Sequence, residues 1–281
     1  MNLNLDPTFT PLGDINGIDY QAFTFSGGEP HVKIISDLSS VEHVNISHRI
    51  KSFNDIGLVL ISVDALRRSG VKSIDLIIPY FPAARQDRVM VAGESLSVKV
   101  YADIINALKL NKVIIYDSHS EVAIALLNNC KPVSNHLFIK KVIDSIGDVT
   151  LLSPDGGALK KIYKLSAYLG GIKVVECSKS RDVKTGKLSG FKVYSDDLKG
   201  ANCIIVDDIC DGGGTFMGLA KELKKKNVGK LYLAVSHGIF NKGLDELTNY
   251  FDKIFTTDSF SALEAHPQLV QLKLEDNLIY L

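Results

Sequence analysis

Short apolar runs recur along the whole chain and alternate with segments in which apolar residues repeat at helical spacing. The runs that predict strands cover residues 32–35, 57–63, 74–78, 113–116, 149–152, 172–175, 203–206, 230–235 and 253–256. Residues 97–108 and 216–223 each place their apolar side chains on one helical face, which predicts amphipathic helices. Apolar strands that alternate with such helices are typical of parallel sheets covered by helices. The pattern therefore predicts an α/β fold.

A chain of 281 residues is long enough for two domains of ordinary size. No low-complexity linker separates the halves, but the polar stretch at residues 128–135 is the best break near the middle. We therefore expect a boundary near residue 140, with one domain over residues 1–140 and a second over residues 141–281. Each half repeats the order of strand, polar loop and helix, which suggests a duplicated architecture.

Charge and cysteine usage narrow the class of protein. The 32 basic and 32 acidic side chains cancel, which argues against binding to nucleic acid or to an anionic membrane and favours small anionic ligands. The four cysteines have no C-x-x-C spacing, which argues against a zinc site and predicts free thiols in a reducing compartment. The N-terminus has neither a basic stretch nor an apolar run of a secretory leader, so we expect a cytoplasmic protein.

The strongest chemical signal is the segment 204–216, where a buried strand leads into carboxylates, glycines and the start of a helix. Asp207 and Asp208 follow the apolar residues, and open α/β sheets bind ligands at the carboxyl ends of their strands. Glycines 212–214 let backbone N–H groups approach an anion, and Thr215 opens a helix whose positive end faces it. Carboxylates beside such a phosphate site suit ribose hydroxyls or a divalent cation. A surface turn with acidic caps is the alternative.

A second polar loop follows the predicted strand at residues 74–78. It carries Arg85, Gln86, Asp87 and Arg88 behind two prolines that stiffen the loop. Two permanently charged guanidinium groups and an amide suit a polyphosphate and hydrogen bonds to a base or ribose. A loop held by salt bridges between Asp87 and the arginines is the alternative.

Three more polar sites follow predicted strands. His119 could ligate a metal or position phosphate oxygens, although a structural histidine is the simpler interpretation of this residue alone. Asp155 lies among glycines and suits Mg²⁺ or a hydroxyl group, or it caps the helix that begins near Ala158. Lys179 and Arg181 begin a polar, glycine-containing segment that could close over a reacting phosphate, although most such segments are solvated hairpin tips.

Taken together, these motifs resemble the ribose-phosphate pyrophosphokinase family, also called phosphoribosyl-diphosphate synthetases, over roughly residues 20–260. Residues 25–29 are similar to the family's F-S-x-G-E segment, and residues 85–88 to its R-Q-D-R motif. Residues 117–119 are similar to D-L-H, Asp155 to the aspartate of P-D-x-G-[GA], residues 179–181 to K-x-R, and residues 207–215 to the ribose-phosphate loop.

The resemblance implies two phosphoribosyltransferase-type domains, a cytoplasmic enzyme with Mg²⁺ as cofactor, and assembly into a homo-oligomer, either a dimer or a hexamer. It assigns ATP binding to Arg85, Gln86, Asp87 and Arg88, together with Phe25 and Glu29 that reach the adenine of a neighbouring subunit. It assigns metal binding to His119 and Asp155, and catalysis to Lys179, Arg181 and His119. It assigns the ribose phosphate to Asp207, Asp208, Asp211, Gly212, Gly213, Gly214 and Thr215.

Two departures from the family pattern bear on the substrate. The family usually has D-T-[GA]-G-T in the loop that holds the 5-phosphate, whereas this chain has Gly212 in place of the threonine. Ser118 replaces the usual leucine, and the chain is shorter than typical bacterial members. The missing hydroxyl and the extra backbone space leave open an acceptor with a substituted 5-phosphate, such as ADP-ribose.

The sequence therefore predicts transfer of diphosphate from ATP to the anomeric hydroxyl of ribose 5-phosphate, giving 5-phosphoribosyl 1-diphosphate and AMP. The same transfer to ADP-ribose, within NAD metabolism, is the first alternative. A nucleotide-salvage phosphoribosyltransferase would explain residues 207–215 but not the arginine loop or Lys179 and Arg181. A catalytically silent regulatory subunit with this fold is a further alternative, against which the presence of His119, Asp155, Lys179 and Arg181 argues.

Overall fold

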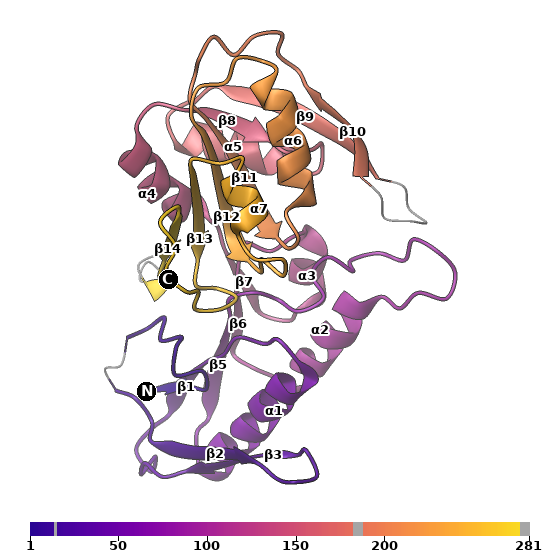
Figure 1. The fold of residues 1–281 in the computed structure, drawn as a ribbon. Coiled ribbons are helices and arrows are strands. Elements are labelled where there is room, and N and C mark those ends of the chain that lie inside the picture. Colours follow the sequence, from indigo (N-terminus) through magenta and orange to yellow (C-terminus); the bar gives the residue numbers. More distant parts are fainter. Residues whose placement is uncertain (14–15, 182–187, 276–281) are drawn as a thin grey trace. The chain divides into compact units, whose positions relative to one another are not determined.

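The chain forms two compact units in the computed structural model, which describes residues 1–13, 16–181 and 188–275 (Figure 1). The first unit consists of Met1–Ser134 together with the C-terminal segment that begins at Lys273, and the second consists of Asn135–Leu272. The domain boundary that we expect near residue 140 stays a prediction, because compactness alone does not define a folding domain.

The first unit is built on a five-stranded parallel sheet with the strand order β1-β4-β5-β6-β7. An antiparallel hairpin of β2 and β3 forms a separate small sheet. The elements are β1 (Asn2–Asn4), β2 (Tyr20–Thr24), β3 (Pro30–Ile34), β4 (His43–Ser47), α1 (Phe53–Arg68), β5 (Ser73–Ile78), α2 (Ser97–Ala107), β6 (Lys112–Tyr116), α3 (Glu121–Leu126) and β7 (Cys130–Val133).

Residues 57–63 do not form the predicted strand, because they lie inside helix α1. Ser52 and Asp55 begin this helix with a capping box, in which the Ser52 N–H donates to Asp55 Oδ2 at 2.7 Å and the Asp55 N–H donates to Ser52 Oγ at 3.3 Å. The buried apolar residues repeat every three or four positions: Ile56, Val59, Val63 and Leu66. A short apolar run cannot by itself distinguish a buried strand from one face of a buried helix.

The two faces of the first sheet are covered differently. Alternate residues of β5 and β6 pack with α1, α2 and α3 in one core, which places these helices on the same face. The other face carries Ile77, Ile114 and Tyr116, which pack with Phe9 of the N-terminal segment and with Leu274. Leu274 is completely buried, so the chain returns from the second unit to complete the core of the first.

The second unit contains a seven-stranded sheet with the order β10-β9-β8-β11-β12-β13-β14, in which only the β9–β10 hairpin is antiparallel among the pairs described. Its elements are α4 (His136–Ile146), β8 (Thr150–Ser153), α5 (Leu159–Tyr168), β9 (Val174–Arg181), β10 (Leu188–Val193), β11 (Cys203–Cys210), α6 (Gly214–Lys224), β12 (Leu231–Gly238), α7 (Asp245–Thr248), β13 (Lys253–Thr257) and β14 (Leu269–Leu272).

Helices cover both faces of this second sheet. One core contains apolar residues of α4 and α5, and the opposite core contains those of α6 and α7 (Figure 1). The chain order reverses between β8 and β11, because β9 follows β8 in one direction and β12 follows β11 in the other. Open α/β sheets bind ligands beyond the carboxyl ends of the strands at such a reversal. The predicted α/β fold is confirmed, and its topology singles out the loops after β8 and β11.

All four cysteines are free thiols, and Cys177, Cys203 and Cys210 are buried. Burial raises the pKa of Cys177 to about 12 and that of Cys203 to about 11, so these thiols stay protonated at neutral pH. Within the described ranges, no helix combines the length and apolarity needed to cross a membrane.

Candidate functional site

Two adjacent carboxylates lie at the topological reversal of the second sheet. Asp207 and Asp208 are part of β11, which runs four residues further than the predicted strand and ends at Cys210. The pairing of β11 with β8 stops at Ile205, whereas its pairing with β12 continues to Cys210. Both carboxylates therefore lie beyond the end of β8, where the sheet opens on one side.

The two carboxylates interact strongly. The Asp208 N–H donates to Asp207 Oδ1 at 3.0 Å, and Asp208 is buried. Burial raises the pKa of Asp207 well above its ordinary value, and the carboxylates of Asp208 and Asp155 raise it further. A ligand that donates hydroxyl hydrogen bonds or brings positive charge relieves this repulsion, so the pair is suited to a sugar diol or a cation.

Asp155 and Lys179 form an ion pair next to these carboxylates. Lys179 Nζ lies 2.7 Å from Asp155 Oδ2, and it also donates to Thr215 Oγ1 at 3.2 Å. The other Asp155 oxygen accepts from the N–H groups of Gly157 and Ala158, at 2.9 and 3.1 Å. Asp155 therefore stabilises the turn before α5 and holds a lysine, and its predicted role as a ligand of Mg²⁺ or of a hydroxyl group stays a prediction.

The pKa of Asp155 reflects this arrangement. Burial would raise it, but the hydrogen bond and charge of Lys179 and the two backbone N–H groups outweigh burial. The pKa of Asp155 consequently lies below its ordinary value, so this carboxylate is charged at neutral pH. The bridge from Asp155 through Lys179 to Thr215 brings together residues from the ends of β8, β9 and α6.

The glycine loop before α6 makes a tight turn into the helix. Gly213 caps the helix with φ of 73°, a left-handed conformation that strains other residues, and an added Cβ would lie 2.8 Å from Leu247 Cδ2. The loop after β12 packs against it, since the Asn241 N–H donates to the Asp211 carbonyl at 3.2 Å. Residues 211–215 thus lie between the end of β9, which supplies Lys179, and the loop after β12.

The predicted K-x-R pair is described only in part. Lys179 is in β9 with a side chain that is 18% exposed, and the backbone of Arg181 ends the same strand. Residues 182–187, the remainder of the segment that we expect to close over the phosphate, lie outside the described residues.

In the first unit, the arginine loop follows β5 and lies near the end of β6. Arg88 Nε donates to Asp87 Oδ1 at 2.9 Å, so the salt bridge that the sequence offered as an alternative is present. The Arg88 side chain is 70% exposed, whereas that of Asp87 is 4% exposed, so the salt bridge lies at the surface with its carboxylate covered. Burial would raise the pKa of Asp87, but hydrogen bonds from Arg88 and Ser120 and the charges of Arg88 and His119 lower it below its ordinary value.

The candidate metal-binding residues are in different units, with His119 exposed after β6 and Asp155 after β8. Among the described residues, no group of three or more histidine, cysteine, aspartate or glutamate side chains is placed to hold a metal ion. Mg²⁺ commonly needs only one or two protein ligands, because water and substrate phosphates complete its coordination. A carboxylate such as that of Asp155 suits such a partial coordination, and the metal-binding roles of His119 and Asp155 stay predictions.

The predicted adenine-binding segment forms the tip of the β2–β3 hairpin. The Phe25 N–H donates to the Glu29 carbonyl at 2.8 Å, and Gly28 closes the turn. The rings of Phe23, Phe25 and His31 pack against one another, and Phe25 meets Phe23 edge-to-face with the ring centroids 4.8 Å apart; Phe25 is 52% exposed. Exposed aromatic rings held on a hairpin provide a surface on which a base or another protein can pack.

A buried polar cluster follows β4 in the first unit, and the sequence analysis did not identify it. Arg49 is 3% exposed, pairs with Asp6 at 3.1 Å and donates to Thr8 Oγ1 at 2.7 Å. His48 Nε2 lies 3.3 Å from Asp55 Oδ1, while Nδ1 is buried and has no hydrogen-bond partner among the described residues. Burial lowers the pKa of His48 below its ordinary value, although Asp55 opposes the shift. These residues fix the N-terminal segment and α1 to the sheet.

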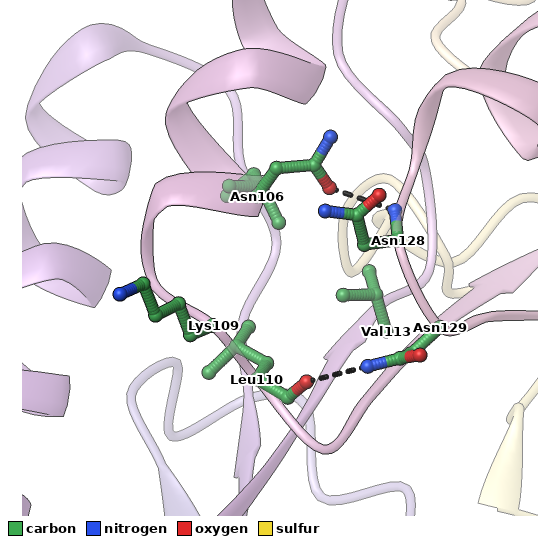
Figure 2. Close-up of a pocket in the computed structure, with 7 residues that line it drawn as sticks. Asn106, Lys109, Leu110, Val113, Asn128 and Asn129 are labelled. Carbon is green, nitrogen blue, oxygen red and sulfur yellow. Dashed lines mark hydrogen bonds between the residues drawn. The ribbon is translucent and has the colours of Figure 1, made fainter.

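A surface pocket of ≈ 230 Å³ lies elsewhere in the first unit, between the end of α2 and the start of β7 (Figure 2). Its amides are used to join these elements: the Asn128 N–H donates to Asn106 Oδ1 at 2.8 Å, and Asn129 Nδ2 donates to the Leu110 carbonyl at 3.0 Å. The pocket is at the amino ends of β6 and β7, away from the loops that carry the candidate residues. We therefore regard it as a structural feature.

Comparisons with known proteins agree with the fold. Residues 12–108 match the N-terminal domain of ribose phosphate pyrophosphokinase, and residues 125–267 match the phosphoribosyl transferase domain. The ribose-phosphate pyrophosphokinase of Mycoplasmopsis pulmonis is 31% identical over 228 residues, which cover 79% of this chain and 70% of that protein. The protein of the same name from Thermococcus kodakarensis is 29% identical over 264 residues, covering 89% and 90%.

A solved structure extends the agreement. Phosphoribosylpyrophosphate synthetase from Mycobacterium smegmatis superposes with a TM-score of 0.84 over 98% of this chain and 95% of that one, at 23% sequence identity. This similarity establishes that the two chains have the same fold.

Proposed function

Because the chain belongs to the ribose-phosphate pyrophosphokinase family, we propose that it transfers diphosphate from ATP to the anomeric hydroxyl of ribose 5-phosphate. The products are 5-phosphoribosyl 1-diphosphate and AMP. The observation that carries the proposal is the bridge from Asp155 through Lys179 to Thr215, next to Asp207. This bridge brings the Lys179 ammonium group, the glycine loop and a pair of carboxylates together at the carboxyl ends of the strands, where open α/β sheets bind ligands.

The acceptor sugar is held by the second unit. Asp207 and Asp208 accept hydrogen bonds from its 2- and 3-hydroxyl groups, which relieves the repulsion that raises the pKa of Asp207. Residues 211–215 bind the 5-phosphate through backbone N–H groups, the Thr215 hydroxyl and the positive end of α6. This arrangement fixes the sugar at both ends and thereby orients its 1-hydroxyl.

ATP is held by the first unit. Arg85 and Arg88 bind its phosphates, Gln86 contacts the nucleoside, and Asp87 orients Arg88 through their salt bridge. Phe25 and Glu29 contact the adenine of ATP bound to a neighbouring subunit, which makes the active protein a homo-oligomer.

The 1-hydroxyl oxygen attacks the β-phosphorus of ATP in line. A bond forms between this oxygen and the β-phosphorus, the bond from the β-phosphorus to the bridging oxygen breaks, AMP leaves with that oxygen, and the hydroxyl proton is released. Lys179 and Arg181 stabilise the charge that develops on the transferring group, because catalysis of phosphoryl transfer relies on positioning and charge neutralisation.

Mg²⁺, when bound, neutralises the polyphosphate, and His119 and Asp155 would hold it. Asp155 carries negative charge at neutral pH and pairs with Lys179, and both features support the proposal that it binds a cation. His119 is exposed near Asp87 and is accessible to a metal-bound polyphosphate.

A second acceptor is supported by one observation. Gly212 offers no hydroxyl group, and the backbone there is not in a conformation that demands glycine. The loop therefore lacks one donor to a terminal phosphate dianion, which supports an acceptor whose 5-phosphate carries a further group, such as ADP-ribose.

One assay tests these proposals. The protein is incubated with Mg-ATP and either ribose 5-phosphate or ADP-ribose, and AMP release and the product mass are followed. We expect AMP together with an acceptor whose mass has increased by a diphosphate, and product formation that is at least about a hundredfold slower in a Lys179→Met variant. Folded protein that releases no AMP with either acceptor would contradict the proposal and favour a regulatory subunit.

A further inference from the structure

A second lysine lies against the glycine loop, and the proposed function does not use it. Lys242 belongs to the loop after β12, which the Asn241 N–H joins to the Asp211 carbonyl. A Cβ built on Gly212 would lie 3.5 Å from Lys242 Cε and 3.6 Å from Lys242 Cδ. The aliphatic part of Lys242 therefore passes over Gly212, in the space that a side chain at position 212 would enter.

This geometry places a positive charge beside the phosphate site. The ammonium group is one bond beyond Cε, so it is within about 5 Å of the position of that Cβ. Lys242 is exposed and takes part in no ion pair within the described part of the chain. Lys179, by contrast, is already bonded to Asp155 and Thr215. The charge of Lys242 is thus available to an anion in the loop.

The two lysines approach the loop from opposite directions. In the sheet order β9-β8-β11-β12, the loop that follows β11 is flanked by Lys179 at the end of β9 and by Lys242 after β12. A phosphate monoester carries up to two negative charges, and the helix terminus supplies only a fraction of one positive charge. A second ammonium group completes the neutralisation.

We propose that Lys242 binds the phosphate group on O5 of the acceptor sugar and that Gly212 provides the space for its side chain. The inference rests on the proposed function, since it concerns the acceptor of that reaction. Lys242 thereby takes the place of the hydroxyl donor that Gly212 lacks. The residues 212 and 242 form one specificity unit, in which a small residue at 212 permits a long cation from the neighbouring loop.

The test compares ribose 5-phosphate with ribose and uses direct binding as well as turnover. Lys242→Met keeps the length of the side chain and removes its charge; Lys253→Met, an exposed lysine at the amino end of β13, is the matched control. We expect Lys242→Met to raise both the calorimetric Kd and the KM for ribose 5-phosphate about tenfold, because a charged hydrogen bond is lost. The KM of ATP and the weak affinity for ribose should not change.

A double variant separates a direct contact from a general disturbance of the loop. Gly212→Thr restores a hydroxyl donor, and Lys242→Ala vacates the space that the threonine enters, so the Gly212→Thr/Lys242→Ala double variant should recover at least threefold of the affinity that Lys242→Ala loses. The inference is overturned if Lys242→Met changes ribose 5-phosphate affinity by less than threefold, or if ribose is affected equally. Wild-type protein that binds ribose 5-phosphate but releases no AMP would refute the proposed reaction while leaving the Lys242 contact measurable.

Discussion

Replacing Lys179 by methionine distinguishes a lysine that stabilises the transition state from one that binds ATP in the ground state. Lys179 is held by Asp155 at 2.7 Å and by Thr215 at 3.2 Å, so its ammonium group is positioned before any substrate binds. Removing one preorganised donor to developing charge lowers kcat by about a hundred- to a thousandfold. We therefore expect Lys179→Met to reduce kcat by that factor while the KM of ATP changes by no more than a few fold. Arg181→Ala should act in the same way.

The same substitution has a measurable effect on stability. Charged hydrogen bonds contribute about 1.5–3 kcal/mol each, and the partly exposed ion pair puts the loss at the lower end of this range. The pKa of Asp155 is lowered in the folded protein, so its contribution to stability is present above the unfolded pKa and is lost as pH falls through the folded one. The difference in unfolding free energy between wild type and variant should be largest near pH 7 and shrink below pH 4.

The kinetic effect is measured by steady-state kinetics in which ATP is varied at saturating acceptor. The effect on stability is measured by urea denaturation near pH 7 and below pH 4. Lys192→Met is the matched control, because Lys192 is on the neighbouring strand β10 and contacts the Tyr194 ring without touching Asp155. A raised KM for ATP with intact kcat would refute the reasoning and assign Lys179 to ATP binding.

Three further predictions address other parts of the chain. Phe25→Ala and Glu29→Ala should each weaken the binding of ATP. Light scattering should show that the active form is at least a dimer, and its activity should fall on dilution. A fully active monomer would contradict this prediction. Burial lowers the pKa of His48, so the unfolded state binds more protons than the folded one and the protein loses stability as the pH falls. The urea concentration at the unfolding midpoint should therefore decrease from pH 7 to pH 5, and His48→Gln should flatten this dependence. Gly218→Ala should cost about 1–3 kcal/mol in urea denaturation despite the higher helix propensity of alanine, because the new Cβ would lie 2.4 Å from the Phe191 ring; Phe191→Leu should relieve the cost.

Much of the second unit could be predicted because its signals are local. The apolar strand at residues 203–206 and the glycines that follow determine a strand, a turn and a helix start within a few residues, and all three are present. The resemblance also predicted the family and the enzyme class, which the comparisons confirm. The roles assigned to the individual site residues stay predictions.

The first unit was harder to predict because its decisive contacts are distant in the sequence. Residues 57–63 were expected to form a strand, since their apolar run has no periodicity that is visible without the capping box at Ser52 and Asp55. The pair of Arg49 with Asp6 spans 43 residues, and Leu274 completes a core formed by Phe9 and Ile77. No local pattern specifies such pairings.

The ion pair of Asp155 with Lys179 shows how distant contacts change the chemistry of residues that local motifs identify. Each residue follows its own strand, and each had a structural interpretation that was at least as simple as a functional one. Only the adjacency of β8 and β9 in the sheet brings them together, and only the reversal at β11 adds Asp207 and Thr215. The same adjacency makes Asp155 raise the pKa of Asp207 while Lys179 lowers that of Asp155. Charge at this edge is therefore a property of the group, and a substitution at any one of these positions should be judged by its effect on the others.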